Sequence, residues 1–172
     1  MKKENSKIEK IDFVGLEEIR SRLQMFINAQ IIKQKQKKIG MSVSENTNIL
    51  VFKGETGTGK SLVAEYFISQ LIKSNCLFSN AVVRTTAHKF QRQYLTDTEI
   101  SKFLCEQKLG VFLIDEVHDD KTYLYELLLG LTEKKLDTIC ILLGLKQNLE
   151  EFFLEKSELT DLVTFFDFPV VN

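Results

Sequence analysis

The chain has 172 residues, the usual size of one domain, of which 44% are hydrophobic and 27% are charged. Its net charge of −1 lacks the strong positive excess that marks nucleic-acid or anionic-membrane binding. No apolar run approaches the roughly 20 residues needed to span a bilayer, and no signal-peptide core follows the charged N-terminus. Cys76, Cys105 and Cys140 are widely spaced and odd in number, so we expect free thiols and a cytoplasmic protein.

The first half of the chain predicts a flexible start, a helix and a buried strand. Residues 1–10 are polar, and we expect them to be flexible. Apolar residues at spacings of three and four predict an amphipathic helix that begins near Leu16, runs into the lysine-rich stretch 33–38 and ends at Gly40. Residues 48–52 are a short apolar run, typical of a strand that is buried on both faces of a parallel sheet.

The second half continues this alternation. A glycine-rich loop and a helix over 61–73 are followed by further strands at 81–83, 111–114, 138–143 and 163–168, with helical faces around 100–104, 124–131 and 149–153. Five strands that alternate with helices predict a parallel sheet covered on both faces. We therefore expect one α/β domain over residues 11–172.

Residues 54–61 form a complete phosphate-binding loop, Gly54-Glu55-Thr56-Gly57-Thr58-Gly59-Lys60-Ser61. The loop follows a predicted strand and opens a predicted helix, so its backbone N–H groups and the helix N-terminus are placed to bind phosphate. The motif assigns Lys60 to the β- and γ-phosphates and the Ser61 hydroxyl to Mg²⁺. The predicted ATP contacts in this segment are Glu55, Thr56, Gly57, Thr58, Gly59, Lys60, Ser61 and Leu62.

Two adjacent carboxylates, Asp115 and Glu116, follow the apolar run 111–114. In P-loop enzymes an aspartate at the end of a strand beside the P-loop strand binds Mg²⁺, and an adjacent glutamate can act as the base that polarises the attacking water. We therefore predict Asp115 as a metal ligand and Glu116, together with Lys60, as catalytic. The alternative is a solvated acidic turn, since this loop also contains Asp119 and Asp120.

The order of these motifs resembles that of the AAA+ ATPases, within the group of stage V sporulation protein K and the red-type rubisco activases. The resemblance covers residues 13–169: 54–61 matches Walker A, 111–116 matches Walker B, and 143–152 and 166–169 are similar to later family segments. Residues 13–19 resemble the N-terminal box that lies against the adenine, with Val14 and Gly15 at the matching positions. The resemblance implies a three-layer α/β/α P-loop NTPase core with strand order 5-1-4-3-2, assembly into rings, and ATP hydrolysis that remodels a protein partner.

Three departures from that pattern support an alternative, a nucleotide-gated binding or scaffold subunit with weak or no ATPase activity. Residues 158–163, at the family's arginine-finger position, contain no arginine, and no arginine follows Arg92. Residues 143–145 offer no polar sensor side chain, and Lys146 is the nearest candidate. The chain also ends just after the fifth predicted strand, so we expect this large subdomain to lack the helical lid.

The sequence around Tyr94 has two interpretations. Tyr94, Leu95 and Thr96 lie where ring ATPases of this kind carry an aromatic loop that grips a polypeptide, but an ordinary tyrosine at a loop–helix junction fits equally well. The lysines of 33–38 are typical of a solvated helix end. A DNA-acting loader needs a basic track that this sequence does not show, so the expected partners are a protein substrate or other subunits, homo- or hetero-oligomeric.

Overall fold

The computed structural model describes residues 15–42, 48–94, 96–117, 122–133 and 137–170. Five parallel strands form one sheet in the order β2-β3-β4-β1-β5. This is the predicted order 5-1-4-3-2, counted from the opposite edge. The strands are β1 (Ile49–Lys53), β2 (Val82–Thr86), β3 (Val111–Asp115), β4 (Ile139–Gly144) and β5 (Thr164–Asp167).

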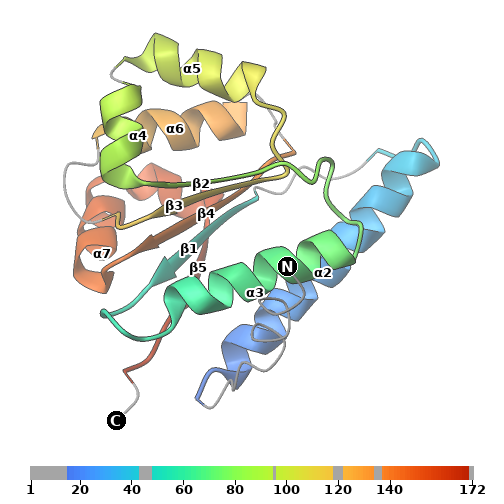
Figure 1. The fold of residues 1–172 in the computed structure, drawn as a ribbon, viewed down its shortest axis with the longest axis horizontal. Coiled ribbons are helices and arrows are strands. Elements are labelled where there is room, and N and C mark those ends of the chain that lie inside the picture. Colours follow the sequence, from blue (N-terminus) through green and yellow to red (C-terminus); the bar gives the residue numbers. More distant parts are fainter. Residues whose placement is uncertain (1–14, 43–47, 95, 118–121, 134–136, 171–172) are drawn as a thin grey trace.

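Helices cover both faces of the sheet, as predicted for a three-layer α/β/α core (Figure 1). One face packs against α2 (Glu17–Lys38) and α3 (Lys60–Lys73). The other face packs against α4 (Ala87–Gln93), α5 (Asp97–Glu106), α6 (Thr122–Glu133), α7 (Lys146–Glu155) and the 3-10 turn η1 (Ser157–Leu162). The two hydrophobic cores therefore lie on opposite sides of one sheet. No helix in the described part of the chain is long and apolar enough to cross a membrane.

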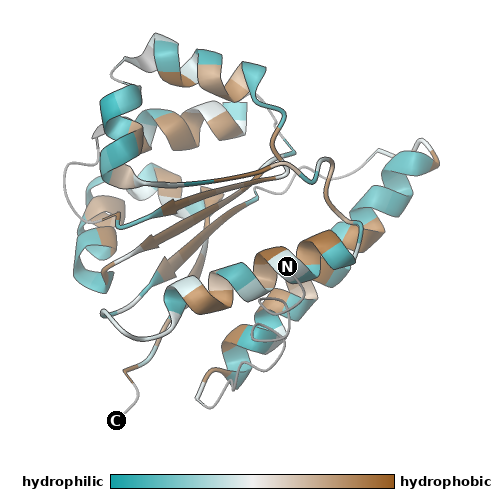
Figure 2. Cartoon of the chain, viewed as in Figure 1, coloured by the Kyte–Doolittle hydropathy of each residue, from teal (hydrophilic) through white to brown (hydrophobic). Residues whose placement is uncertain are grey.

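The central strands are more deeply buried than the edges. Strands β1, β3 and β4 are apolar at almost every position (Figure 2), and nearly all their residues are buried because both faces are covered. In the edge strand β2, in contrast, no residue is fully buried. The continuous apolar runs in the sequence therefore correctly identified the centre of the sheet.

One predicted strand has different bounds, and the helix after it was not predicted from the sequence. The second strand was expected at 81–83 but extends over Val82–Thr86, and α4 follows it at once. The strand continues through polar residues because it lies at the edge of the sheet, where one side faces solvent. Thr86 begins α4 by accepting a hydrogen bond from the Lys89 N–H at its Oγ1, 3.3 Å away.

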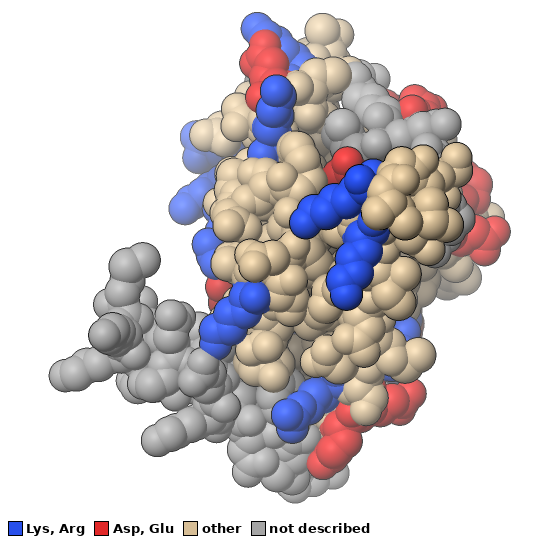
Figure 3. All heavy atoms as spheres, turned by 90° about the vertical axis from the view of Figure 1, so that its right-hand side faces the viewer, with Lys and Arg blue, Asp and Glu red and all other residues tan. Residues whose placement is uncertain are grey.

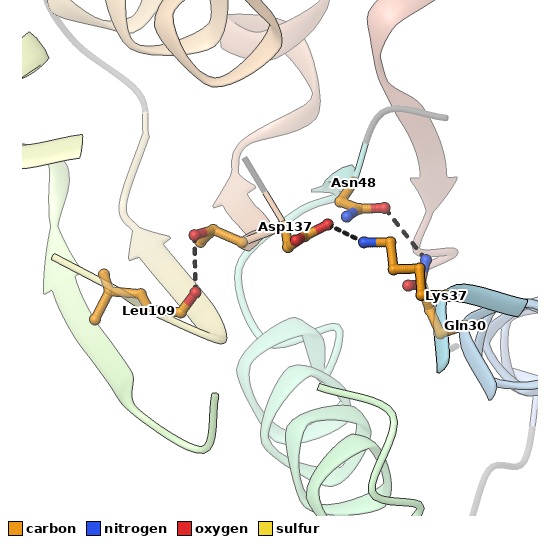
Figure 4. A network of polar contacts seen from close by, with 6 residues as sticks. Gln30, Lys37, Asn48, Leu109 and Asp137 are labelled. Carbon is orange, nitrogen blue, oxygen red and sulfur yellow. Dashed lines mark hydrogen bonds and ion pairs between the residues drawn. The ribbon is translucent and has the colours of Figure 1, made fainter. Parts of the chain in front are cut away.

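Polar side chains join α2 to the amino end of the sheet (Figure 4). Gln30 donates a 3.2 Å hydrogen bond from Nε2 to Oδ1 of Asn48, and both residues are buried. Near the end of α2, Lys37 forms an exposed ion pair with Asp137, just before β4. These contacts satisfy the buried amides and hold α2 against the start of β1 and β4.

Candidate nucleotide-binding site

The glycine-rich loop runs between β1 and α3, as its sequence predicts. Gly57 has φ +81° and Gly59 has φ +89°, in the left-handed region that favours glycine. A Cβ at either position would meet no atom within 4 Å, so these glycines are required by backbone conformation and not by crowding. The loop therefore curls over the N-terminus of α3, which is a favourable place for an anion.

Lys60 points back into this loop. Its Nζ donates hydrogen bonds to the carbonyl oxygens of Gly54 and Glu55, each at 2.7 Å. Partial burial lowers the pKa of Lys60, while the negative charges of Asp115 and Glu55 oppose that shift. Because its contacts in the loop are to neutral carbonyl groups, the ammonium is available for the stronger charge-assisted bonds that phosphate oxygens offer.

The two predicted metal ligands come together although they are 54 positions apart in the sequence. The Ser61 hydroxyl donates a 3.2 Å hydrogen bond to Oδ2 of Asp115. The other carboxylate oxygen, Oδ1, accepts a 2.7 Å hydrogen bond from the N–H of Glu116. A hydroxyl and a carboxylate at the edge of a phosphate loop are oxygen ligands of the kind that Mg²⁺ takes, with further positions filled by phosphate and water. The residues therefore fit Mg·ATP.

Glu116 has an unusual backbone. Its φ of +56° is in the left-handed region, which is uncommon for a residue other than glycine and occurs often at functional sites. The next residue, Val117, is fully buried and donates its N–H to the carbonyl oxygen of Leu143 on β4, at 3.0 Å. The chain is thus fixed on both sides of Glu116, whose side chain is exposed beside Asp115. In the described structure, the Asp115–Glu116 segment is a constrained turn at the predicted site.

Gly144 connects this turn to the phosphate loop. Its carbonyl oxygen accepts a hydrogen bond from the Gly54 N–H at 3.3 Å. A Cβ at Gly144 would lie 2.2 Å from the carbonyl oxygen of Val117, so only glycine allows this close approach. The ends of β1, β3 and β4 therefore pack into one unit, in which the phosphate loop and the acidic turn keep a fixed relation.

Sequence reasoning missed Lys53, the last residue of β1. Its Nζ lies 3.3 Å from Oε1 of Glu150 on α7 and 3.4 Å from Oδ1 of Asp167 on β5. The Lys53 side chain is only 14% exposed and also lies over the Phe165 ring. A single charge at the end of an otherwise apolar strand was the signal that could have identified it. Lys53 thus joins the start of the phosphate loop to the two elements that flank it.

The predicted roles of several other residues remain predictions. Val14, Leu95, Asp119 and Asp120 lie outside the described residues. Gly15 directly precedes α2, where its N–H is 3.3 Å from Oε1 of Glu17, and its contact with adenine stays a prediction.

Two further predicted side chains are described, and the role of Leu62 stays a prediction. Leu62 is 52% exposed on α3. The half-buried Tyr94 ring packs against Phe90 and Phe103, each at 4.8 Å between centroids, which is the environment expected of an ordinary packed tyrosine.

The described residues contain no group of three or more His, Cys, Asp or Glu side chains placed to hold a metal ion by themselves. Their cysteines form no disulfide: Cys76 and Cys140 are buried and Cys105 is exposed. The Ser61–Asp115 pair is consequently the candidate metal site that these residues offer, with the remaining ligands supplied by nucleotide and water.

No family model matches the chain. It is 27% identical over 160 residues to the protein cbbX homolog of Guillardia theta, covering 85% of this chain and 43% of that protein. It is 24% identical over 168 residues to the ribulose bisphosphate carboxylase/oxygenase activase of Cyanidioschyzon merolae, covering 88% and 56%. With stage V sporulation protein K of Bacillus subtilis it shares 23% identity over 150 residues, covering 81% and 47%. The chain thus spans about half the length of these curated relatives.

Solved structures support the fold. The crystal structure of DnaI superposes with a TM-score of 0.61 at 11% identity, covering 96% of this chain and 88% of that one. A putative primosome component from Streptococcus pyogenes superposes with a TM-score of 0.61 at 15% identity, covering 95% and 86%. The curated relatives are AAA+ ATPases, and their similarity extends over the strands and loops that form the site. The chain therefore resembles the large subdomain of the AAA+ ATPases, in the group that includes stage V sporulation protein K and the red-type rubisco activases.

Proposed function

We propose that the chain is an ATP-binding module that hydrolyses ATP to ADP and phosphate and thereby remodels a protein partner. The observation that carries this proposal is the 3.2 Å contact between Ser61 and Asp115, with Lys60 and Glu116 next to them in the sequence. One group binds phosphate, two bind the metal, and one carboxylate lies free at the same edge of the sheet. These are the parts of a phosphoryl-transfer site that one subunit supplies.

Each residue then has one role. Lys60 exchanges its carbonyl partners for the β- and γ-phosphate oxygens, and the N–H groups of the loop bind the same phosphates. Bound Mg²⁺ neutralises charge that develops on the phosphates. Ser61 and Asp115 would hold that metal, while Glu116 accepts the proton of the attacking water. Glu116 is suited to this role because its side chain is exposed, and its backbone N–H, not its carboxylate, bonds to Asp115.

The partner is proposed from the relatives. The name of one describes an activase of ribulose bisphosphate carboxylase/oxygenase, which is itself a protein. For this chain we propose only the general class of partner. That partner is a protein substrate or another subunit, within a ring of identical or different subunits. In Figure 3, which faces the amino end of the sheet, the described lysine and arginine side chains lie among uncharged and acidic residues and form no continuous basic track. A filter-binding assay with duplex DNA at low salt checks the expectation that no salt-sensitive affinity exists.

Calorimetry and a phosphate-release assay test the proposal. Wild-type protein is expected to bind Mg·ATP, and Lys60→Ala to lose that binding, whereas Lys108→Ala changes an exposed lysine outside the loop and keeps it. Glu116→Gln is expected to keep ATP binding but lose turnover, while Glu155→Gln on α7 changes neither. If the wild-type chain binds no nucleotide, the proposal is wrong.

A second candidate function is a nucleotide-gated binding subunit with little turnover of its own. The observation that favours it is the lack of any arginine after Arg92, in particular in 158–163. An arginine from a neighbouring subunit contributes roughly 10³–10⁵ in rate in phosphoryl-transfer enzymes that use one. Adding a partner subunit that carries an arginine in that stretch should raise turnover if the chain is an ATPase that needs help. An unchanged rate with ATP still bound favours the gated subunit.

A further inference from the structure

Strand β2 lies at an edge of the sheet and has unpaired backbone groups. Among the described strands it pairs only with β3. The Ala81 carbonyl oxygen, just before the strand, accepts a hydrogen bond from the Val111 N–H at 3.3 Å. Because alternate residues of a strand direct their N–H and C=O to opposite sides, Val82 and Arg84 direct theirs to the outer edge, whereas Thr86 is the N-cap of α4 and its carbonyl oxygen belongs to the start of that helix. Such an edge is a template for another extended chain.

A groove is lined by residues of β2, β3, α4 and α5. Helices α4 and α5 lie on the same face of the sheet (Figure 1). The volume of the groove is about 590 Å³. The lining consists of three consecutive residues of β2, the amides of Gln93 and Gln107, two cations on α4 and an aromatic floor. The lining residues are Val83, Arg84, Thr85, Lys89, Phe90, Arg92, Gln93, Tyr94, Phe103, Gln107 and Phe112. The groove thus offers apolar surface next to backbone hydrogen-bonding groups.

The charge of the groove has one sign. Lys89 and Arg92 are exposed on α4, and their side chains have no ion-pair partner among the described residues. Arg84 is already neutralised, because its Nε and Nη2 donate to the two carboxylate oxygens of Glu65 at 2.7 and 2.8 Å. Among the residues that the structure describes, no acidic one lines the groove. A ligand that carries carboxylates is therefore complementary to it.

We propose that this groove binds an extended acidic segment of a protein partner, which adds to the sheet as a sixth strand beside β2. Its backbone would pair with the outer N–H and C=O groups of Val82 and Arg84. Residues two apart in a strand lie on the same face. The segment should therefore place an aromatic or aliphatic side chain against the half-buried Val83 and Tyr94, with an acidic residue two positions away beside Lys89 or Arg92.

Two other occupants fit less well. A second copy of the chain, paired through its own β2, would bring Lys89 and Arg92 of both copies to one seam, where like charges repel. A single-stranded nucleic acid needs exposed aromatic faces on which bases stack. Phe90 and Phe112 are each only 1% exposed, so these rings form a buried floor and not a stacking platform. An acidic peptide satisfies both the charge and the free edge.

This docking goes beyond the proposed ATPase function, because none of the lining residues belongs to the phosphate loop or the acidic turn. The probe is a fluorescein-labelled peptide of about six residues, the usual length of a strand, in which glutamate, phenylalanine and glutamate alternate with threonines. Fluorescence anisotropy is expected to show saturable binding to wild-type protein and to Lys60→Ala, with or without Mg·ATP. Binding to Lys60→Ala separates this proposal from the nucleotide site.

Variants with reversed charge test the electrostatic part. Lys89→Glu combined with Arg92→Glu should lower the affinity for the peptide by about tenfold or more, since each reversal replaces an attraction by a repulsion. Lys102→Glu combined with Lys108→Glu makes the same change in net charge at exposed positions outside the groove, and should weaken it by about twofold or less. Equal losses in the two double variants would show that only net charge matters and would overturn the proposal.

N-methylated peptides test strand addition itself. Methyl groups on one alternate set of peptide nitrogens block the N–H groups that face β2, whereas methyl groups on the other set point away from it. One set should therefore abolish binding and the other should preserve it. Equal binding of the two methylated peptides, no binding of the unmodified peptide, or its displacement by an equimolar polythymidine oligonucleotide would each overturn the proposal.

Discussion

The two ends of the parallel sheet use polar groups in opposite ways. At the amino end, Gln30 and Asn48 are each 7% exposed and are joined by a hydrogen bond, and the Asn48 carbonyl oxygen accepts the Cys140 N–H at 2.8 Å. At the carboxyl end, Gly57 and Glu116 have backbones in the left-handed region, and the Glu116 side chain is exposed. Polar groups are satisfied by one another at the first end and remain available to a ligand at the second.

This difference separates stability from binding. A buried amide pair adds to stability only while both partners are present. Strained turns and charges beside a phosphate loop cost some stability, and they persist where function uses them. Substitutions at the amino end should therefore lower the free energy of unfolding and leave ATP affinity unchanged. Substitutions at the carboxyl end should lower ATP affinity more than their effect on stability explains.

The largest change in stability is expected from Asn48→Leu. It leaves the buried Gln30 amide without its side-chain partner and should lower the free energy of unfolding by about 2 kcal/mol in urea titrations. Adding Gln30→Leu should recover part of this loss, because both polar groups are then replaced by apolar ones. ATP affinity measured by calorimetry should stay that of the wild type. A parallel loss of affinity would show that the two ends are coupled.

The next prediction concerns Gly57→Ala, with Gly40→Ala as its matched control. Both glycines have a positive φ, +81° and +77°, and a Cβ would meet no atom within 4 Å at either position. Each substitution should therefore cost about 1–2 kcal/mol of backbone strain. In Gly57→Ala the strain falls on the phosphate loop, so ATP affinity should drop by about tenfold, whereas Gly40→Ala should keep it. Equal ATP affinities of Gly57→Ala and Gly40→Ala would contradict the prediction that strain in the phosphate loop affects binding more than strain elsewhere.

Alkaline pH should change the contributions of the two ends to the free energy of unfolding in opposite directions. Burial raises the pKa of the Cys140 thiol at the amino end to about 12 from its ordinary 9.0. Above pH 9 the unfolded chain releases this proton and the folded chain retains it, so stability falls as pH rises, by about 1.4 kcal/mol at pH 10. Cys140→Val should remove this loss in unfolding titrations between pH 8 and 10, while Cys105→Ser, at an exposed thiol, should leave it in place.

Lys60 at the carboxyl end responds with the opposite sign. Desolvation lowers its pKa from the ordinary 10.5, so the folded state carries a penalty for the charged form at neutral pH. The penalty disappears as pH rises through the folded value toward 10.5. Its effect is smaller than that of Cys140 because Lys60 is only partly buried. Lys60→Met should therefore change the slope of stability against pH in the direction opposite to Cys140→Val.

The smallest effect is expected from Lys37→Ala. The Lys37–Asp137 pair has side chains that are 36% and 43% exposed, so water screens it. The free energy of unfolding should fall by about 0.5 kcal/mol or less, and high salt should remove the difference. A loss as large as that of Asn48→Leu would mean that the ion pair, and not the buried amides, holds α2 to the sheet.

Sequence patterns predicted the centre of the fold better than its edges. Strands β1, β3 and β4 were visible as apolar runs, because burial on both faces requires apolar residues at every position. Strand β2 was placed too short, since the strand continues through Arg84, Thr85 and Thr86, and polar residues are allowed where one side faces solvent. Helix α4 was missed for a different reason: it has only seven residues, too few for a clear apolar pattern, and it follows the strand without a loop.

The candidate site shows a similar division. Gly57, Gly59, Lys60 and Ser61 were predicted because the phosphate loop is a local motif, whose spacing alone sets the direction of its backbone groups. Lys53 was missed because its partners Glu150 and Asp167 are brought to it only by the neighbouring strand and helix. Its charge was visible in the sequence, but the surroundings that bury it were not.

By itself, the sequence determined the alternation of strands and helices, the phosphate loop and the order of the acidic pair after it, since each depends on residues close together in the chain. Only the tertiary structure decided which distant groups meet. Ser61 reaches Asp115 because β3 and β1 lie on either side of β4 and all three end at the same edge of the sheet. The left-handed turn at Glu116 and the open edge of β2 are likewise consequences of how strands pair, which local propensity does not contain.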